Sequence, residues 1–483
     1  MDVIKTSRYK ISVEEISEGG PGGYESVYLA KEGDRATDGL YGVLNGFNGR
    51  LLPAVNKTVR QRNGDALENA LKTGKPMGIA SGFKPSGAYH FGHRLTSSTL
   101  AFFQKNGVQV FVPVADVECQ MAKEKPEQYM LTAADNLLDW GANGVNLDAA
   151  HVYFQSEENR VFTISYKIAP KLNFGDVVDI YGAKKLLLGD PKKGKPAEFP
   201  FIFSGITQVA DILLPQHTDF GNELSFMVSG QDQDGHMKMT MLLTGRTLDD
   251  EIFLEGVKAI PSAFYIPHVR GLRGDKASSS DPKSTLYLGA GKPVLHAESG
   301  KIGWEYDLSL DDRISRSIQT MGNALRDDRE LVEKFALDMV RYIDFFNAHS
   351  NVSFNELSAS SKYSNLQEKM ELATTLEEQA VIQSEIDNYL IDECKAVKQD
   401  NIEIVFDSME EALKEHQKRR QAVFNYSKER SSYRPQGGWS LDDDRPVQPG
   451  FWKIPERAAV DEAKRNKTRW FDIISAAADK IVP

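Results

Sequence analysis

The chain has 483 residues, of which 58 are Lys or Arg and 69 are Asp or Glu, so its formal net charge is −11. Hydrophobic residues make up 41% and charged residues 26%, which is ordinary for a globular protein. These values exclude a disordered polyampholyte, a collagen-like fibre and a uniformly basic nucleic-acid coat protein. At roughly 100–200 residues per domain, the length predicts about two to four domains. The acidic total does not exclude nucleic acid, because phosphate binding depends on local Lys and Arg clusters.

The first segment, residues 1–75, is interpreted as an N-terminal mixed α/β extension. Its start lacks a basic segment followed by an apolar run, so no secretory signal is expected. Two loosely alternating stretches, at 9–16 and 24–30, are separated by a Gly/Pro-rich turn and predict a β-hairpin.

The next segment, residues 76–290, alternates short β-branched runs with amphipathic stretches. Strands are predicted at 77–83, 108–117, 151–155 and 224–230, and a helix is predicted at 95–107, where Gly107 is a plausible stop. Alternation of this kind is typical of an α/β fold with a parallel sheet.

Helix formers dominate residues 291–430, mainly from about Asp311 onward, with apolar residues at three- and four-residue spacing in 331–346 and 402–421. This spacing predicts a helical bundle. Residues 431–483 form a C-terminal extension, with an irregular Pro- and Asp-rich arm at 433–455 and a last predicted helix at 470–481.

The two cysteines, Cys119 and Cys394, are far apart and belong to no CxxC or Cys/His cluster. A zinc site or a disulfide framework is therefore not expected, and two thiols suit a reducing cytosol. No stretch approaches the roughly 20 apolar residues of a membrane span. We expect a cytoplasmic protein with no membrane association.

A loop rich in glycine and histidine lies between the first predicted strand of 76–290 and the following helix. It reads Ser81-Gly-Phe-Lys-Pro-Ser-Gly-Ala-Tyr-His90-Phe-Gly-His93. Ligands bind α/β sheets at the carboxyl ends of the strands, and a helix N-terminus favours anions. The imidazoles of His90 and His93 can donate to phosphate oxygens, so the loop predicts phosphate binding. The alternative is a His-x-x-His pair that only caps the helix.

A second loop, residues 272–282, carries Lys276 and the hydroxyls of Ser278, Ser279 and Ser280. Such a group can surround a polyphosphate with charge and hydroxyl donors. Taken alone, this loop is as easily a solvated turn.

Together the two loops have a known counterpart. His90-Phe-Gly-His93, followed in the same α/β region by Lys276-Ala-Ser-Ser-Ser280, resembles the HIGH and KMSKS motifs of class I aminoacyl-tRNA synthetases. Between them, Gln208-Val-Ala-Asp211-Ile-Leu resembles the AADIL segment of the tryptophanyl branch. Gly230-Gln-Asp-Gln-Asp-Gly-His-Met-Lys-Met-Thr240 resembles the G-x-DQ-x-x-H-x-x-x-T segment of that branch.

The resemblance covers about residues 76–430 and implies a Rossmann-type catalytic domain at 76–290 followed by an α-helical anticodon-binding-like domain at 291–430. It also implies a homodimer, ATP and Mg²⁺ as cofactors, and no resident metal site. The implied reaction activates L-tryptophan with ATP to the aminoacyl-adenylate and transfers it to tRNA(Trp).

The resemblance implies a role for each candidate site residue. The catalytic residues are His90 and His93, which hold ATP near its α- and β-phosphates, and Lys276, which clamps the β- and γ-phosphates. The ATP-binding residues are Gly82, Ser86, Gly92, Asp232, Gln233, Ser278 and Ser280.

The amino-acid pocket is assigned to Glu118, Gln208 and Asp211. Asp211 would accept a hydrogen bond from the indole N–H, or from a phenol O–H if the substrate is tyrosine. The alternative for Asp211 is a helix-start carboxylate satisfied by backbone amides, and for Glu118 a surface acid.

A basic helical stretch at 414–420 predicts contact with RNA, through Lys414, Lys418, Arg419 and Arg420. The alternative is a solvated helix face.

The chain also departs from the family pattern. The second and fourth positions of the KMSKS-like loop are Ala277 and Ser279, where the family has Met and Lys. These losses weaken the expected pyrophosphate clamp. They keep open a synthetase-like paralogue that ligates the activated amino acid to a non-tRNA acceptor, and a non-enzymatic RNA-binding relative.

Overall fold

The computed structural model describes residues 34–35, 60–122, 126–181, 199–249, most of 254–289, 292–295, 302–305, 310–328, 361–373 and 402–430, with isolated positions elsewhere. The hairpin predicted within 9–30, the arm predicted at 433–455 and most of the helix predicted at 331–346 lie outside the described residues. Of the helix predicted at 470–481, Trp470 and Ile474 are described and are helical.

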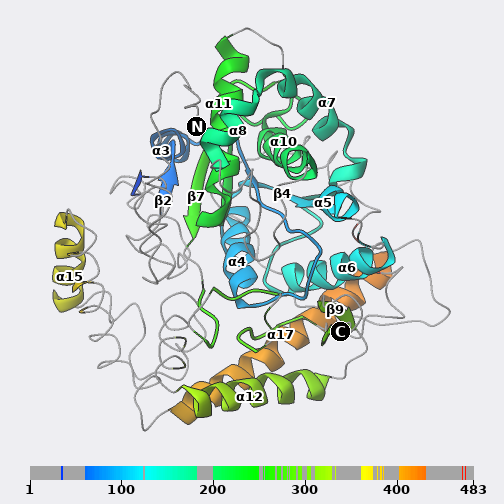
Figure 1. Ribbon diagram of the computed structural model, residues 1–483, viewed down its shortest axis with the longest axis vertical. Helices are drawn as coiled ribbons and strands as arrows, with labels where there is room; N and C mark the ends of the chain where they lie inside the picture. Colours follow the sequence, from blue (N-terminus) through cyan, green and yellow to red (C-terminus); the bar gives the residue numbers. More distant parts are fainter. Residues whose placement is uncertain are drawn as a thin grey trace, which may run out of the picture.

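A seven-stranded sheet forms the centre of the molecule, in the order β1-β2-β7-β6-β3-β4-β5 (Figure 1). The strands from β7 to β5 are parallel, whereas β1 and β2 are antiparallel additions beside β7. The predicted α/β fold with a parallel sheet is therefore confirmed. The bounds are β1 Asp34–Arg35, β2 Arg60–Arg62, β3 Met77–Ala80, β4 Gln109–Val114, β5 His151–Phe154, β6 Leu224–Gly230 and β7 Ser262–Ile266.

The sheet is covered on both faces, and its side chains alternate between two cores. Val110, Val112 and Val114 of β4 face one core, while Phe111 between them faces the other. This is the period of two that a strand requires. All six residues of β4 are buried, as expected of a central strand in a parallel sheet.

One core is built mainly with α3 Gly64–Thr73, α4 Phe91–Lys105, α6 Pro126–Ala142 and α17 Ile402–Arg430. The other is built mainly with α7 Asn159–Ile168, α10 Phe199–Leu213 and α11 Asp234–Asp249, beside α8 Phe174–Tyr181. Figure 1 shows α7, α8, α10 and α11 gathered at one end of the molecule, with α12 Leu310–Asp327 and α17 side by side at the other.

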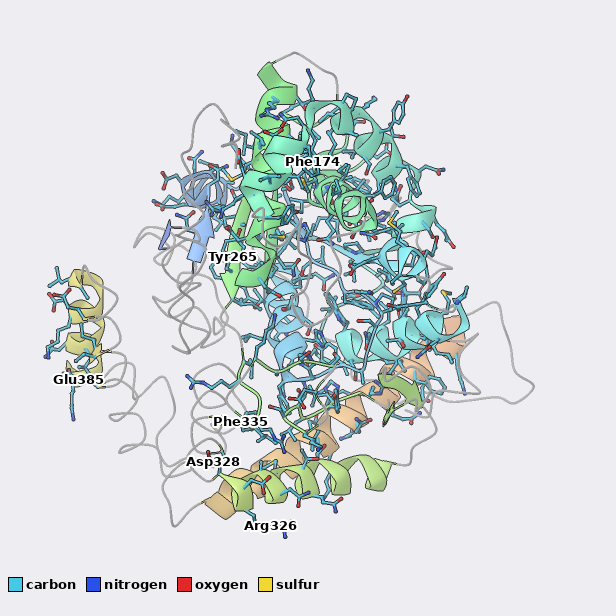
Figure 2. The ribbon with its side chains drawn as sticks, in the orientation of Figure 1. Phe174, Tyr265, Arg326, Asp328, Phe335 and Glu385 are labelled. Atoms are coloured by element: carbon cyan, nitrogen blue, oxygen red, sulfur yellow. The ribbon has the colours of Figure 1, made fainter. Side chains whose placement is uncertain are left out.

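The segment predicted to be helical, 291–430, begins with an antiparallel pair of strands, β8 Lys292–Leu295 and β9 Ile302–Glu305. The helices α12, α15 Ser361–Leu372 and α17 follow. Leu413 and Phe424 of α17 belong to the same core as α6 and the sheet. Figure 2 shows α15, near the labelled Glu385, standing away from that core.

Short helices and turns complete the sheet's carboxyl edge. α5 Asp116–Met121 follows β4, the 3₁₀ turn η3 Gln155–Glu157 follows β5, and the 3₁₀ turn η6 Gln231–Gln233 follows β6. Two further 3₁₀ turns, η4 Ala169–Lys171 and η5 Leu214–Gln216, extend α7 and α10. Every strand from β3 to β6 therefore ends in a segment that carries predicted site residues or neighbours them.

Candidate active site

The glycine- and histidine-rich loop leads from β3 into α4, and its two histidines cap that helix. Nδ1 of His90 accepts from the N–H of Gly92 at 3.0 Å, and Nδ1 of His93 accepts from the N–H of His90 at 3.3 Å. The two rings stack with their centroids 3.9 Å apart. The capping alternative is thus realised in the structure, and it does not exclude a ligand role.

Burial and the capping hydrogen bonds determine the protonation state of the two imidazoles and which ring nitrogen can donate. Burial lowers the pKa of His90 well below its ordinary value, and burial together with the charge of Lys276 lowers that of His93 to about 4. Both rings are therefore neutral near pH 7. Since Nδ1 of each ring accepts a backbone hydrogen bond, the ring proton lies on Nε2, which becomes a neutral donor.

Two glycines of this loop, Gly82 and Gly92, lie so close to neighbouring atoms that a side chain would not fit there. A Cβ on Gly82 would lie 1.9 Å from the carbonyl oxygen of Pro113, because the loop runs alongside β4 there, bonded to it on either side of Gly82. A Cβ on Gly92 would lie 2.9 Å from Cε1 of His90. The backbone N–H of Ser86, the third predicted ATP contact in this loop, donates to the carbonyl of Lys84 at 2.8 Å.

The second loop lies against the first. Residues His90 and Tyr287 form an isolated antiparallel bridge, and the hydroxyl of Ser279 donates to the carbonyl of Ala88 at 3.3 Å. The N–H of Leu288 donates to the carbonyl of Tyr89 at 2.7 Å. The structure thus brings together the two motifs that the sequence separates by about 180 residues.

Lys276 reaches the segment that follows β6. Its Nζ lies 2.7 Å from a carboxylate oxygen of Asp232, and both side chains are about one third exposed (32% each). Gln233 Nε2 lies 3.4 Å from the same carboxylate. The predicted contacts Asp232 and Gln233 therefore lie beside the predicted phosphate clamp.

The loop that carries Lys276 is well held despite the absence of Met and a second Lys. The N–H of Ala277, a buried residue, donates to the carbonyl of Val269 at 2.9 Å. Ser278 is tied to Thr285 by two hydrogen bonds, of 3.0 and 2.8 Å. The sequence did not indicate these contacts. Ser280 lies outside the described residues.

Asp234, which directly follows Gln233, links two neighbouring strands of the sheet. It accepts from Arg62 of β2 at 2.7 Å and from the hydroxyl of Tyr265 of β7 at 2.8 Å. Burial raises the pKa of Asp234, but the hydrogen bonds from Arg62, Lys238 and Tyr265 outweigh burial and lower it. Sequence reasoning missed this buried ion pair, because nothing local relates β2 to α11.

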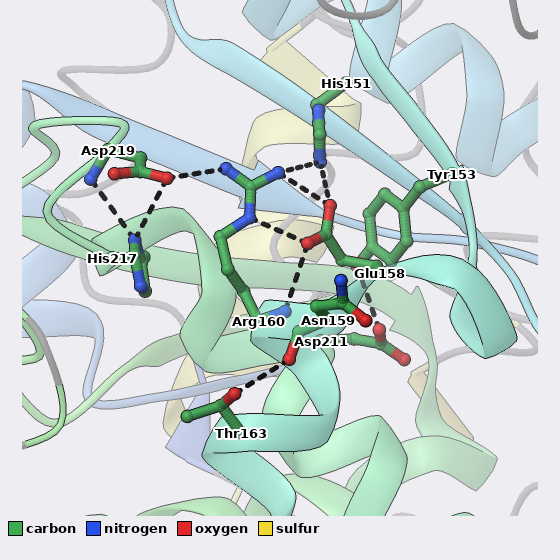
Figure 3. Close-up of polar contacts among 9 residues, drawn as sticks. All are labelled: His151, Tyr153, Glu158, Asn159, Arg160, Thr163, Asp211, His217 and Asp219. Carbon is green, nitrogen blue, oxygen red and sulfur yellow. Dashed lines mark hydrogen bonds and ion pairs between the residues drawn. The ribbon is translucent and has the colours of Figure 1, made fainter.

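Asp211, in the last turn of α10, lies beside β5 (Figure 3). Its carboxylate accepts from the hydroxyl of Tyr153 at 2.9 Å on one oxygen and from the amide of Gln155 on the other. Burial raises the pKa of Asp211 to about 7, against the lowering effect of both hydrogen bonds. The predicted alternative, capping by backbone amides, is not what the structure shows.

Figure 3 also shows an ion network next to Asp211, which the sequence did not indicate. Arg160 binds Glu158 at 2.7 Å and Asp219 at 3.0 Å, and Glu158 contacts His151 at 2.9 Å. The guanidinium also lies 4.5 Å from the centroid of the Phe220 ring. This network fixes the segment after β5 to the segment that precedes β6.

The other two pocket residues are less enclosed. Gln208 lies one turn before Asp211 on α10, and its amide donates to Ser204 Oγ at 3.4 Å. Glu118 is partly exposed and lies 3.4 Å from Lys84 Nζ. Helix α5, which carries Glu118, packs against α10.

The predicted basic face of α17 needs one correction. Lys414, Lys418 and Arg419 are exposed, but Arg420 is fully buried and ion-paired with Asp135 and Asp139 of α6. The spacing of 3.6 residues per turn places Arg420 on the packed side of the helix. Arg420 therefore does not contribute to an exposed RNA-binding face.

Other predictions bear on metals and membranes. Within the described residues, no group of three or more His, Cys, Asp or Glu side chains is arranged to hold a metal ion. Among the described helices, none is both long and apolar enough to cross a bilayer. Cys119 is a buried free thiol, and burial raises its pKa.

Comparison with known proteins gives this arrangement a class. Residues 72–293 match the sequence model of the family described as tRNA synthetases class I (W and Y). The central region of the chain therefore resembles the class I aminoacyl-tRNA synthetases of the tryptophanyl and tyrosyl branch, as the two motifs predicted.

Within that branch the resemblance is to tryptophanyl enzymes. The chain is 29% identical over 238 residues to the tryptophan–tRNA ligase of Methanocaldococcus jannaschii, a match that covers 48% of this chain and 60% of that relative. It is 30% identical over 233 residues to the corresponding ligase of Aeropyrum pernix, covering 47% and 57%. The matches thus span less than two thirds of these relatives.

Solved structures agree in fold. The tryptophanyl-tRNA synthetase of Aeropyrum pernix K1 aligns with a TM-score of 0.50 at 22% identity, covering 75% of this chain and 83% of that one. The Plasmodium falciparum tryptophanyl-tRNA synthetase aligns with a TM-score of 0.52 at 14% identity, covering 80% and 90%. At such identities the likeness is one of fold.

Proposed function

We propose that this protein is an aminoacyl-tRNA ligase that activates L-tryptophan with ATP and transfers it to tRNA(Trp). The observation that carries the proposal is the convergence of the two motif loops with the segment after β6. His90, Lys276 and Asp232 lie together there, although they are far apart in sequence.

The amino-acid carboxylate attacks the α-phosphorus of ATP, and pyrophosphate leaves. Catalysis of such a step rests on orientation of the reactants and on groups placed where charge develops. The Nε2–H groups of His90 and His93 donate to phosphate oxygens, and they do so as neutral rings. Lys276 supplies the positive charge, since its ammonium can exchange the carboxylate of Asp232 for a phosphate.

Magnesium fits this site as a companion of ATP. Mg²⁺ keeps several waters and is usually held by substrate phosphates with one or two carboxylates. Asp232 is the carboxylate beside Lys276, and the described residues offer no ready-made cage of acidic or imidazole ligands. When bound, the ion would neutralise charge on the pyrophosphate.

Specificity for the side chain is assigned to Asp211. Each of its oxygens already accepts one protein hydrogen bond, and an ionised carboxylate oxygen can accept two. An indole N–H is a donor only and fits the remaining acceptor. Gln208 and Glu118 are proposed to hold the α-amino group.

The RNA partner is proposed to contact the exposed side of α17 through Lys414, Lys418 and Arg419.

A homodimer is also proposed. Two aromatic side chains, Tyr166 of α7 and Phe174 at the start of α8 (labelled in Figure 2), are 83% and 60% exposed. Large exposed apolar side chains are common at interaction surfaces.

Exchange of labelled pyrophosphate into ATP tests the reaction. Exchange should depend on tryptophan, and exchange supported by tyrosine alone would overturn the specificity assignment.

Lys276→Ala should slow exchange by about 100-fold while tryptophan binding changes little, because a charge used in the transition state is lost. Asp211→Ala should collapse discrimination between tryptophan and phenylalanine.

A second candidate differs in the acceptor. Ala277 and Ser279 replace the Met and Lys of the family pattern, which favours a relative that passes the activated amino acid to a small non-tRNA acceptor. Exchange with tryptophan but no charging of tRNA(Trp) would select this candidate. Binding of tRNA without any exchange would indicate the non-enzymatic relative.

A further inference from the structure

A buried polar cluster lies behind the two motif loops, where α17 packs on α6. We call it the α6–α17 cluster. Its members are Asp135 and Asp139 of α6 and His416, Gln417 and Arg420 of α17.

The cluster is held by charge. Arg420 Nη1 lies 2.7 Å from an oxygen of Asp139, and Arg420 Nη2 lies 2.5 Å from an oxygen of Asp135. His416 Nε2 lies 2.9 Å from the same oxygen of Asp139. All five side chains are at least 96% buried. Such a set has little freedom to shift, because any displaced charge would stay buried without its partner.

The cluster contacts both motif loops. The amide of Gln417 donates to the carbonyl of Leu288 at 2.6 Å, and the N–H of Leu288 donates to the carbonyl of Tyr89. The ring of His416 stacks on that of Tyr89, with centroids 6.2 Å apart. Tyr89 directly precedes His90, and Leu288 directly follows Tyr287, the residue bridged to His90.

Helix α6 also contacts the first loop. The amide of Asn136 donates to the carbonyl of Gly87 at 3.2 Å. A Cβ on Gly289 would lie 2.8 Å from Oδ2 of Asp139 and 3.2 Å from the N of Tyr89. The segment after the second loop therefore passes tightly between the cluster and the first loop.

We propose that Gln417, His416 and Arg420 are positioning residues for the nucleotide site. They set how the segment at 287–289 lies against Tyr89 and His90. Through it they set how the imidazole donors stand relative to the charge of Lys276. The proposal rests on the proposed function for its catalytic consequence, but not for its structural one.

An apolar interface would hold α17 on α6 equally well. Replacing a buried ion-pair group by packed apolar side chains is often neutral or stabilising, so binding of the two helices does not require charge. A polar cluster instead fixes one register. The register matters here because a displacement of about 1 Å at a reacting centre can cost about 100-fold in rate.

The test compares two Gln→Leu variants on one helix. Gln417→Leu removes the hydrogen bond to Leu288. Gln421→Leu, one turn further on, removes an exposed bond to Asn425 of 2.9 Å and is the matched control. Gln417 is chosen over Arg420 because a single lost hydrogen bond leaves the protein folded.

For Gln417→Leu we expect the kcat of tryptophan-dependent ATP–pyrophosphate exchange to fall by about fivefold or more, with the KM for tryptophan unchanged. Gln421→Leu should match the parent protein. An equal loss of kcat and of tryptophan affinity, or parental kcat in Gln417→Leu, would overturn the positioning role.

Amide hydrogen exchange tests the positioning role of Gln417 independently of catalysis. In Gln417→Leu, the amides of 287–289 should exchange faster, by about fivefold or more, because the segment is released from α17. The same amides should be unchanged in Gln421→Leu. If the amides of 287–289 are equally protected in the parent protein, in Gln417→Leu and in Gln421→Leu, the positioning proposal is overturned. This holds even if the protein catalyses pyrophosphate exchange. Faster amide exchange in a protein with no pyrophosphate exchange would instead refute only the proposed function.

Discussion

Asp139 and Asp211 are two fully buried carboxylates with opposite behaviour. Burial raises the pKa of both. At Asp211 the partners are the neutral donors Tyr153 and Gln155, and the pKa is raised to about 7. At Asp139 the charge of Arg420, with His416, outweighs burial and lowers the pKa.

The difference shows what each site is suited for. A carboxylate locked by a guanidinium keeps its charge and its place, which suits a cluster that positions other groups. A carboxylate held by neutral donors keeps acceptor capacity and titrates near neutrality, which suits recognition of a donor such as an indole N–H. Substitutions at and around the two aspartates, and on the exposed side of α17, test this difference.

The largest effect is expected from Arg420→Met. It leaves the carboxylates of Asp135 and Asp139 buried without their cation, so the free energy of unfolding should fall by about 3–5 kcal/mol. Urea unfolding measures it. Arg419→Met is the matched control, because Arg419 is exposed and paired with Glu415 at 2.8 Å, and it should change stability by less than about 1 kcal/mol. Equal losses would mean that the buried pairs do not carry the interface.

The second prediction concerns Asp211→Asn and pH. The folded pKa of Asp211, about 7, lies above the unfolded value of about 3.9. Its contribution to stability is therefore fully present below pH ~4 and is lost as the pH rises through 7. Relative to the parent protein, Asp211→Asn should gain about 3–4 kcal/mol between pH 4 and 8, measured by urea unfolding. A constant difference across that range would show an ionised Asp211 throughout.

A smaller effect is expected from Tyr153→Phe, which removes the donor to one oxygen of Asp211. The cost should be about 1–2 kcal/mol at pH 8, where the carboxylate is ionised, and less at pH 5. Tyr265→Phe is the comparison, because Asp234 keeps Arg62 and a lowered pKa. Its cost should be the same at both pH values. Thermal unfolding at the two pH values distinguishes the cases.

The smallest effect on stability is expected from the double variant Lys414→Ala, Lys418→Ala. Both side chains are exposed on α17, so unfolding should change by less than about 0.5 kcal/mol. Binding of tRNA(Trp) should nevertheless weaken, and the slope of log K against log salt should fall by about 1–2. An unchanged slope would place the RNA elsewhere.

Much of the fold was predictable from sequence pattern. The strands at 77–83, 108–117, 151–155 and 224–230 were each found within about three residues of the predicted bounds, because buried β-branched runs between helices have few other solutions. The two short antiparallel strands β1 and β2 were missed. β2 pairs with β7 some 200 positions away, and β1 pairs with β2, so no local pattern encodes where the two strands join the sheet.

The candidate site was predicted unevenly. The structure brings the loops of His90, His93 and Lys276 together, while their catalytic roles stay a prediction from the motifs. Arg420 was placed on the wrong side of its helix, because counting charges says nothing about which side is packed. Burial raises the pKa of Asp211, and its hydrogen-bond donors Tyr153 and Gln155, which lower that pKa, were not identified, because they come from β5 and the turn that follows it.

The class of fold and the two motif loops follow from the sequence alone, as do the residue types that we propose to face a phosphate. The protonation and orientation of those residues depend on the tertiary structure. Proton affinity and rotamer depend on burial and on partners that long-range folding supplies, so two aspartates that look alike in sequence became a fixed ion-pair member and a titrating acceptor. The same long-range packing placed His416 of α17, more than 320 residues from His90 in sequence, against Tyr89 of the first loop.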